Sequence, residues 1–152
     1  MLHFEYSSLI NASVETVWQF HERPDILDIL TPPWQPVRVV RRDRGLEVGS
    51  ISEFLIFLGP FPVRWVARHT ACETHRLFVD EQQSGPMEFW MHRHEFSAEN
   101  GKTRLTDAIE YAIPGGWWSE LLLGWWVESR LRDMFRYRHE VTQRECEKLT
   151  ET

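Results

Sequence analysis

The last part of the chain contains a long segment that is typical of a single helix. Between Ser119 and about Leu149 there is no proline, and Gly124 is the only glycine. Apolar residues recur along the segment at the three- and four-residue spacing of an α-helix. This apolar stripe consists of Leu123, Val127, Leu131, Met134 and Phe135. So long a stripe needs a large apolar surface to cover it, and that need constrains the rest of the fold.

Strand-like segments supply this surface. Short turn sequences such as Gly59-Pro60, Ser84-Gly85-Pro86 and Asn100-Gly101 separate most of them. Another strand-like segment, HFEYSSLIN, opens the chain and leads into two short helical stretches, of which Ser13 can cap the first. The other six segments cover residues 36–42, 50–58, 62–73, 76–83, 87–97 and 103–113.

This order of elements predicts an α+β fold in one domain, residues 1–152. Seven antiparallel strands should form a curved sheet wrapped around the long C-terminal helix, with the two short helices after the first strand. A helix resting across a strongly curved sheet leaves a hollow, so we expect a pocket between them.

The whole chain resembles the START-like, helix-grip superfamily, also called SRPBCC, which includes polyketide cyclases and dehydrases, lipid carriers and pollen allergens. The resemblance rests on LINASVETVWQFH, DEQQSGPMEFWMHRHEF, TRLTDAIEYAIPGG and the C-terminal helix. It implies a cavity for a small apolar or amphipathic molecule. Because the superfamily has no shared catalytic residues, the resemblance assigns none here.

Polar side chains are predicted to gather inside the sheet. Alternation along FWMHRHEF places Trp90, His92 and His94 on one face. A two-residue turn at Asn100-Gly101 sets His94 opposite Asp107, on the face that carries the apolar residues of the last strand.

Two more turns extend this register across the sheet. A turn at Thr74-His75 sets His69 opposite Asp80, and a three-residue turn at residues 84–86 sets Asp80 opposite Trp90. With two apolar residues of the long helix, the predicted ligand-binding residues are Trp65, His69, Asp80, Gln82, Trp90, His92, His94, Asp107, Tyr111, Leu131 and Phe135.

Four interpretations of the polar residues remain open. They can form a satisfied polar interior, or they can anchor a ligand through hydrogen bonds. They can also perform acid–base catalysis, with His94, Asp107, His69 and Asp80 as candidates. A metal site is the weakest interpretation, because the predicted register separates Asp80 from His94 by about 13 Å. Neither a metal nor another cofactor is therefore predicted.

A tryptophan-rich sequence, GGWWSELLLGWW, surrounds the start of the long helix. Neighbouring residues on a helix diverge by about 100°, so Trp117, Trp118, Trp125 and Trp126 cannot all face one core. They can pack against the sheet edge or a dimer mate, or they can form a portal that touches a membrane. The lack of adjacent lysine or arginine weakens the membrane interpretation.

Composition narrows the function further. A net charge of −6 argues against general nucleic-acid binding. Cys72 and Cys146 have neither metal-ligand spacing nor the density of a disulfide scaffold, and MLHFEYSSLI lacks the features of a signal peptide, so a cytoplasmic protein is expected. Whether it is a monomer or a homodimer stays open.

We therefore predict a binding or transport protein rather than an enzyme, for a lipid, quinone or polyketide-like molecule. The alternative is a cyclase or dehydratase that acts on a polyketide-like substrate. A third possibility is a partner-binding domain whose cavity is filled by its own tryptophans.

Overall fold

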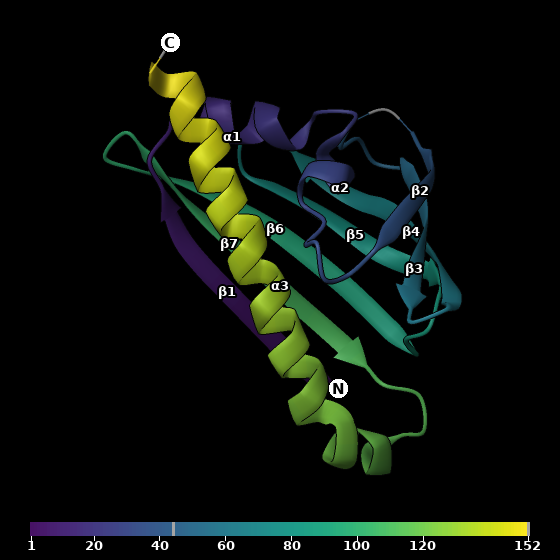
Figure 1. Cartoon of the computed structure of the whole chain (residues 1–152). Helices are drawn as coiled ribbons and strands as arrows, with labels where there is room; N and C mark the ends of the chain where they lie inside the picture. The colour runs from purple at the N-terminus through teal and green to yellow at the C-terminus, as the bar shows by residue number, and fades with distance from the viewer. Residues whose placement is uncertain (44, 152) are drawn as a thin grey trace.

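One sheet curves around one long helix in the computed structural model, which describes residues 1–43 and 45–151 (Figure 1). The seven antiparallel strands lie in the spatial order β1-β7-β6-β5-β4-β3-β2. The predicted helix-grip fold is thus confirmed. The strands are β1 (Leu2–Ile10), β2 (Val37–Arg42), β3 (Ile51–Leu58), β4 (Phe61–Glu73), β5 (Leu77–Ser84), β6 (Phe89–Glu99) and β7 (Lys102–Ala112).

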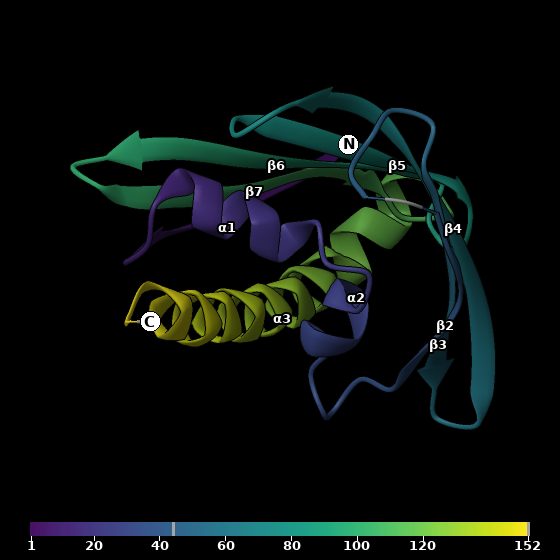
Figure 2. The same cartoon turned by 90° about the horizontal axis from the view of Figure 1, so that it is seen from above.

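Three helices complete the fold: α1 (Val14–His21), α2 (Ile26–Ile29) and α3 (Trp117–Glu151). Ser13 caps α1 as predicted, since its Oγ accepts from the backbone N–H of Thr16 at 3.3 Å. Helix α3 packs chiefly on β1 and α1. Strands β2, β3 and β4 turn away from β6 and β7 to form a second wall (Figure 2). Helix α3 therefore covers one part of the concave face much better than the other.

The apolar stripe of α3 is only partly where the sequence predicted it. Leu131 and Phe135 are buried, but Leu123 is 48% exposed, so its place in the stripe was wrong. Strand β1 begins at Leu2, and the terminal amine of Met1 already reaches Glu120, at 3.3 Å. The first turns of α3 thus run past the end of β1 into solvent. The buried side of the helix continues instead toward its C-terminus through His139, Thr142 and Cys146.

The register of the last hairpin is confirmed: His94 pairs with Asp107 and Trp90 with Tyr111. The pairing of His69 with Asp80 is also confirmed, for a different reason than the one predicted. Three residues, not two, connect Glu73 to Leu77, and a bulge after His69 restores the register.

The predicted register between β5 and β6 was wrong by two residues. Asp80 pairs with His92 rather than Trp90, and Phe78 pairs with His94 rather than His92. The side chain of Gln82 occupies the connection, where it bonds both the backbone N–H and the carbonyl of Met87. A shift of two residues leaves every side chain on its predicted face, but it brings Asp80 beside both histidines.

Two apolar clusters fill the space between sheet and helices. The first surrounds Trp18, Phe78 and Phe96, and the second surrounds Trp65 and Phe135. Within residues 1–43 and 45–151, no helix combines the length and the hydropathy that crossing a membrane requires.

Candidate functional site

Asp107 is the hub of a buried polar network. One of its oxygens, Oδ1, lies 2.7 Å from His92 Nε2 and 3.0 Å from His94 Nδ1, while Oδ2 lies 2.6 Å from His139 Nε2. The carboxylate is only 5% exposed, so protein groups replace nearly all of its hydration.

The network continues in both directions from this hub. Asp80 Oδ2 lies 2.9 Å from His94 Nε2, and Ser8 Oγ lies 2.5 Å from His139 Nδ1. Strands β1, β7, β6 and β5 and helix α3 each contribute to one chain of contacts. The network joins the two apolar clusters, because the His94 ring stacks on Phe78 at 3.9 Å and the His92 ring meets Phe135 edge-on.

Both carboxylates of the network are held in the ionised form. Burial raises the pKa of Asp107, but hydrogen bonds from His139, His92 and His94 outweigh it and hold that pKa well below its usual range. Burial acts in the same way on the pKa of Asp80, and the bond from His94 outweighs it. An ionised carboxylate is an acceptor only, so each nitrogen bonded to Asp107 must carry a hydrogen.

The two neighbouring histidines respond to this environment differently. Burial lowers the pKa of His92, and the nearby His94 lowers it further. Burial also opposes the charged form of His94, but Asp107 and Asp80 together raise the pKa of that ring. Positive charge in this part of the network is thus favoured on His94, between the two aspartates.

Two other buried histidines, His69 and His21, stay outside the network. His69 pairs with Asp80 along the strands, but its Nδ1 donates to the carbonyl of Leu46 at 3.0 Å. His21 bonds the carbonyl of Val17 at 2.8 Å, and burial lowers its pKa to about 4.

The structure divides the eleven predicted site residues into three groups. It places His92, His94, Asp80 and Asp107 in one network, and it leaves His69 and Gln82 with backbone partners outside that network. The remaining five lie in the second apolar cluster: Trp65, Trp90, Tyr111, Leu131 and Phe135.

The sequence interpretation missed the contributions of α3 and β1 to the network. His139 follows Phe135 by four residues, so extending the apolar stripe by one turn would have found it. Ser8 gave no comparable signal. Arg138 was also missed; its Nε is buried without a hydrogen-bond partner among the described residues.

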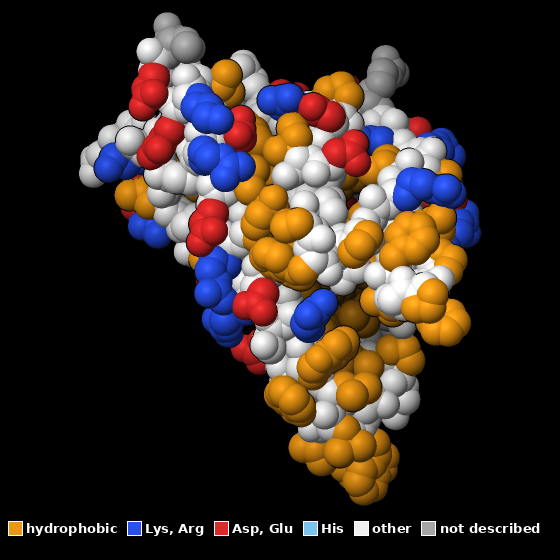
Figure 3. Space-filling model, in the orientation of Figure 1, with side chains coloured by type: hydrophobic (Ala, Val, Ile, Leu, Met, Phe, Trp, Pro, Cys, Tyr) orange, Lys and Arg blue, Asp and Glu red, His pale blue; other side chains and the backbone are white. Residues whose placement is uncertain are grey.

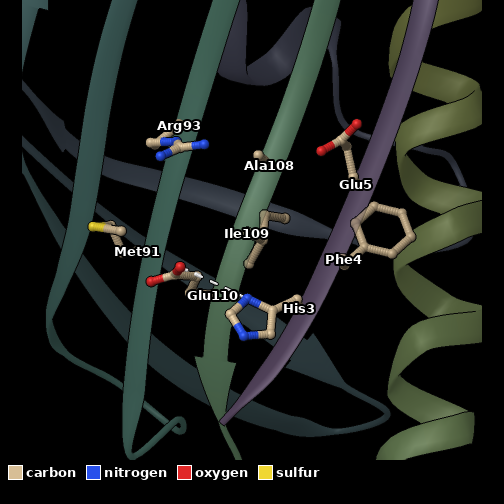
Figure 4. Close-up of a pocket in the computed structure, with 8 residues that line it drawn as sticks. All are labelled: His3, Phe4, Glu5, Met91, Arg93, Ala108, Ile109 and Glu110. Carbon is tan, nitrogen blue, oxygen red and sulfur yellow. Dashed lines mark ion pairs between the residues drawn. The ribbon is translucent and has the colours of Figure 1, made fainter.

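The enclosed space beside the network is small. A cavity of about 20 Å³ is bordered by His94, Asp107, Arg138 and His139. It is large enough for one water molecule. A larger hollow of about 210 Å³ lies on the opposite face of the sheet, across β1, β7 and β6, where His3 and Glu110 are 3.7 Å apart (Figure 4). That hollow does not reach the buried network.

A third hollow is visible between α3 and the β3–β4 hairpin, and apolar side chains form most of its visible rim (Figure 3). Half-buried side chains of β3, α3 and the β5–β6 connection pack against the cluster around Trp65 and Trp90. We call these five residues the apolar wall: Phe54, Ile56, Met87, Val127 and Met134.

The first turns of α3 form an apolar tip that projects from the molecule (Figures 1 and 3). Each of its large side chains is 48–70% exposed. The four tryptophans that were predicted not to share one core all lie outside it. The apolar tip consists of Trp117, Trp118, Leu121, Leu122, Leu123, Trp125 and Trp126.

Comparisons with known proteins agree with this architecture. A family model described as polyketide cyclase/dehydrase and lipid transport matches residues 10–140. No curated protein sequence matches the chain. The structure is similar to the protein TTHA0849 from Thermus thermophilus, with a TM-score of 0.74 and 14% identity, over 95% of this chain and 97% of that one.

Two further solved structures are similar to this fold. The Zhui aromatase/cyclase from Streptomyces sp. R1128 is 14% identical, with a TM-score of 0.71, over 96% of this chain and 93% of that one. A nucleoside-diphosphate sugar epimerase from Corynebacterium glutamicum is 26% identical, with a TM-score of 0.73. That match covers 99% of this chain but 30% of the epimerase, so the likeness concerns less than a third of that enzyme.

Proposed function

Because this chain belongs to the polyketide cyclase/dehydrase and lipid transport family, whose members bind hydrophobic ligands or act as polyketide cyclases, we propose that it binds a small amphipathic molecule between α3 and strands β3–β5. The ligand classes that fit are a lipid, a quinone or a polyketide-like molecule. The observation that carries this proposal is the apolar wall, whose large side chains stay half-buried where they pack against the cluster around Trp65 and Trp90.

The apolar wall suits the hydrophobic part of such a ligand. Burying apolar surface is worth about 25 cal/mol per Å², so a ligand that covers these side chains gains affinity from them. Helix α3 packs chiefly on β1 and α1, so its packing on β3 is less extensive. We expect the ligand to widen this space as it enters.

The polar end of the ligand has a partner deeper inside. Arg138 lines the small cavity beside His94, and its buried Nε has no hydrogen-bond partner among the described residues. An oxygen atom on the ligand would satisfy this donor and replace the single water molecule that the cavity can hold. The site thus favours a molecule that is apolar along most of its length and carries an oxygen at one end.

Native mass spectrometry followed by extraction should identify a bound amphipathic molecule, and a charge in the apolar wall should weaken its binding. We expect Met134→Glu to reduce the affinity for a fluorescent fatty acid at least about tenfold, which corresponds to about 1.4 kcal/mol. The matched control is Ser129→Glu, which adds a carboxylate at an exposed position of the same helix. Equal affinities for the two variants would place the ligand elsewhere.

The apolar tip supports a second part of the proposal, contact with a membrane surface during ligand loading. Its exposed side chains spread over about two thirds of the helix circumference at about 100° per residue, which is wider than the face a single protein groove covers. Tryptophan favours the membrane–water interface. Few charges lie within the tip, so zwitterionic and anionic vesicles should bind comparably.

Removing two tryptophans should test this contact. Full burial of a large apolar side chain is worth about 1.5–3 kcal/mol, so Trp125→Ser/Trp126→Ser should weaken binding to phosphatidylcholine vesicles at least about tenfold in cosedimentation. The matched control is Trp34→Ser, because Trp34 is 50% exposed but lies outside the tip. Concentration-dependent self-association that the tip variant abolishes, without vesicle binding, would instead assign the tip to a second copy of the chain.

Acid–base catalysis is the alternative function, and the position of His94 favours it. The ring lies between Asp80 and Asp107 and borders the small cavity, so it can exchange a proton with a molecule that enters there. Turnover of a polyketide-like thioester that disappears in His94→Gln would identify an enzyme rather than a carrier.

A further inference from the structure

The atoms of Asp80, His92 and His94 converge on one point inside the sheet. His94 Nε2 and His92 Nδ1 lie 2.9 Å and 3.8 Å from Asp80 Oδ2. One nitrogen or oxygen from each of the three residues lies within 4.8 Å of the other two. The register predicted from the sequence had separated Asp80 from His94, and that separation was the main ground for discounting a metal here.

The hydrogen bonds to Asp107 decide which ring nitrogens are free. Its Oδ1 takes a hydrogen from His92 Nε2 and another from His94 Nδ1, because the carboxylate is an acceptor only. In each neutral ring the other nitrogen then carries a lone pair, and these are the two nitrogens that face Asp80. These lone pairs and the Asp80 oxygen repel one another unless a proton on His94 Nε2 or a metal ion lies between them.

We propose that Asp80, His92 and His94 bind one divalent transition-metal ion, and that Asp107 is a positioning residue that orients both histidines. This arrangement has the pattern found around protein metals, in which each ligating histidine donates its other N–H to a carboxylate. Ligands held about 2.0–2.2 Å from one metal lie roughly 3–3.6 Å apart, and the two separations from Asp80 bracket that range.

The negative charge of the two aspartates and the partial exposure of the ligands both suit a metal ion. With neutral histidines, Asp80 and Asp107 carry two negative charges, which a divalent ion balances. A single proton on His94 would balance one of them. The side chains of His94 and Asp80 are 13% and 17% exposed, so an ion can reach them from solvent.

The ligand set indicates the class of metal. Two histidines and one carboxylate suit zinc or iron(II), and three protein ligands leave coordination positions open. A water molecule or the oxygen of a bound molecule can occupy an open position. A metal ion can bind these residues whether or not the proposed hydrophobic ligand binds between α3 and the sheet.

Metal titration of the purified protein tests the site. Full-length protein without a polyhistidine tag is stripped with a chelator, and Co²⁺ and then Zn²⁺ are added. We expect about one Co²⁺ per chain, with visible absorption bands of a low-coordinate site that Zn²⁺ abolishes. Zinc should also raise the unfolding temperature in a concentration-dependent way.

Variants separate the proposed site from adventitious binding. Asp80→Asn and His92→Ala/His94→Ala should each lower the Zn²⁺ affinity at least about 100-fold, and Asp107→Asn roughly 10–100-fold. His3→Ala, on the exposed face of the sheet, should leave the affinity unchanged. If the double variant does not fold, Asp80→Asn decides, because it keeps the size of the side chain. Absence of the visible bands, or equal affinity in wild type and Asp80→Asn, would overturn the proposal in favour of a protonated His94.

Discussion

Asp107→Ala should lower the free energy of unfolding by about 3–5 kcal/mol, the cost of removing one partner from a buried charge network. Three histidine nitrogens bond this carboxylate at 2.6–3.0 Å, and all three lose their acceptor together. The buried rings would then have to turn, take up water or remain unsatisfied. Urea unfolding followed by tryptophan fluorescence would measure the loss.

Glu110→Ala is the matched control for Asp107→Ala. Glu110 belongs to the same strand, β7, but its side chain is 43% exposed on the outer face, next to His3. Its replacement should change the free energy of unfolding by no more than about 0.5 kcal/mol. A similarly small change for Asp107→Ala would mean that water readily replaces the network.

Acid should destabilise the protein well before its carboxylates are protonated. Burial lowers the pKa values of His21, His69 and His92 in the folded chain, that of His21 to about 4. Between about pH 6.5 and pH 4 the unfolded chain therefore binds more protons than the folded chain, so the free energy of unfolding falls as the pH falls. His21 alone contributes about 3 kcal/mol to this loss, at 1.36 kcal/mol for each pKa unit.

One histidine acts in the opposite direction. The raised pKa of His94 contributes stability that is present below about pH 6.5 and lost as the pH rises through its folded value. Three histidines have a lowered pKa and one has a raised pKa, so we expect the free energy of unfolding to fall in acid. The lowered pKa values of Asp80 and Asp107 add to this loss only below about pH 4, where the unfolded carboxyls take up protons.

Unfolding curves at about pH 7.5 and about pH 4.5 would measure the acid effect. In His21→Phe the ring keeps its shape among Phe20, Phe78 and Phe96 but cannot be protonated, so the difference between the two pH values should shrink by about 3 kcal/mol. An unchanged difference in this variant would show that His21 is not the source of the acid sensitivity.

The fold was largely predictable because the signals that determine it are local. Alternation, turn residues and the absence of proline after Ser119 placed each element to within a few residues. The Asn100-Gly101 turn was enough to pair His94 with Asp107, since Asn100 and Gly101 both have the positive φ that such a turn requires.

The site was less predictable because it depends on contacts between distant parts of the chain. The β5–β6 register depends on how the Gln82 side chain bonds Met87, which no turn rule includes. Ser8 reaches the network through His139 from the other end of the sequence. The exposure of Leu123 depends on where β1 ends relative to α3, which a stripe alone does not reveal.

The position of β1 at the edge of the sheet, next to β7, also affects the order in which the strands can pair during synthesis. Strands β2 to β7 follow one another as neighbours in the sheet, so hairpins can join them as the chain leaves the ribosome. Among the described strands β1 is paired with β7, as in Leu2 with Tyr111, so it cannot pair until β7 has been synthesised. During synthesis the first strand is therefore a free segment, and β7 is an open edge that other chains can reach. Closing that edge and docking α3 on β1 are expected to be late and mutually dependent steps of folding.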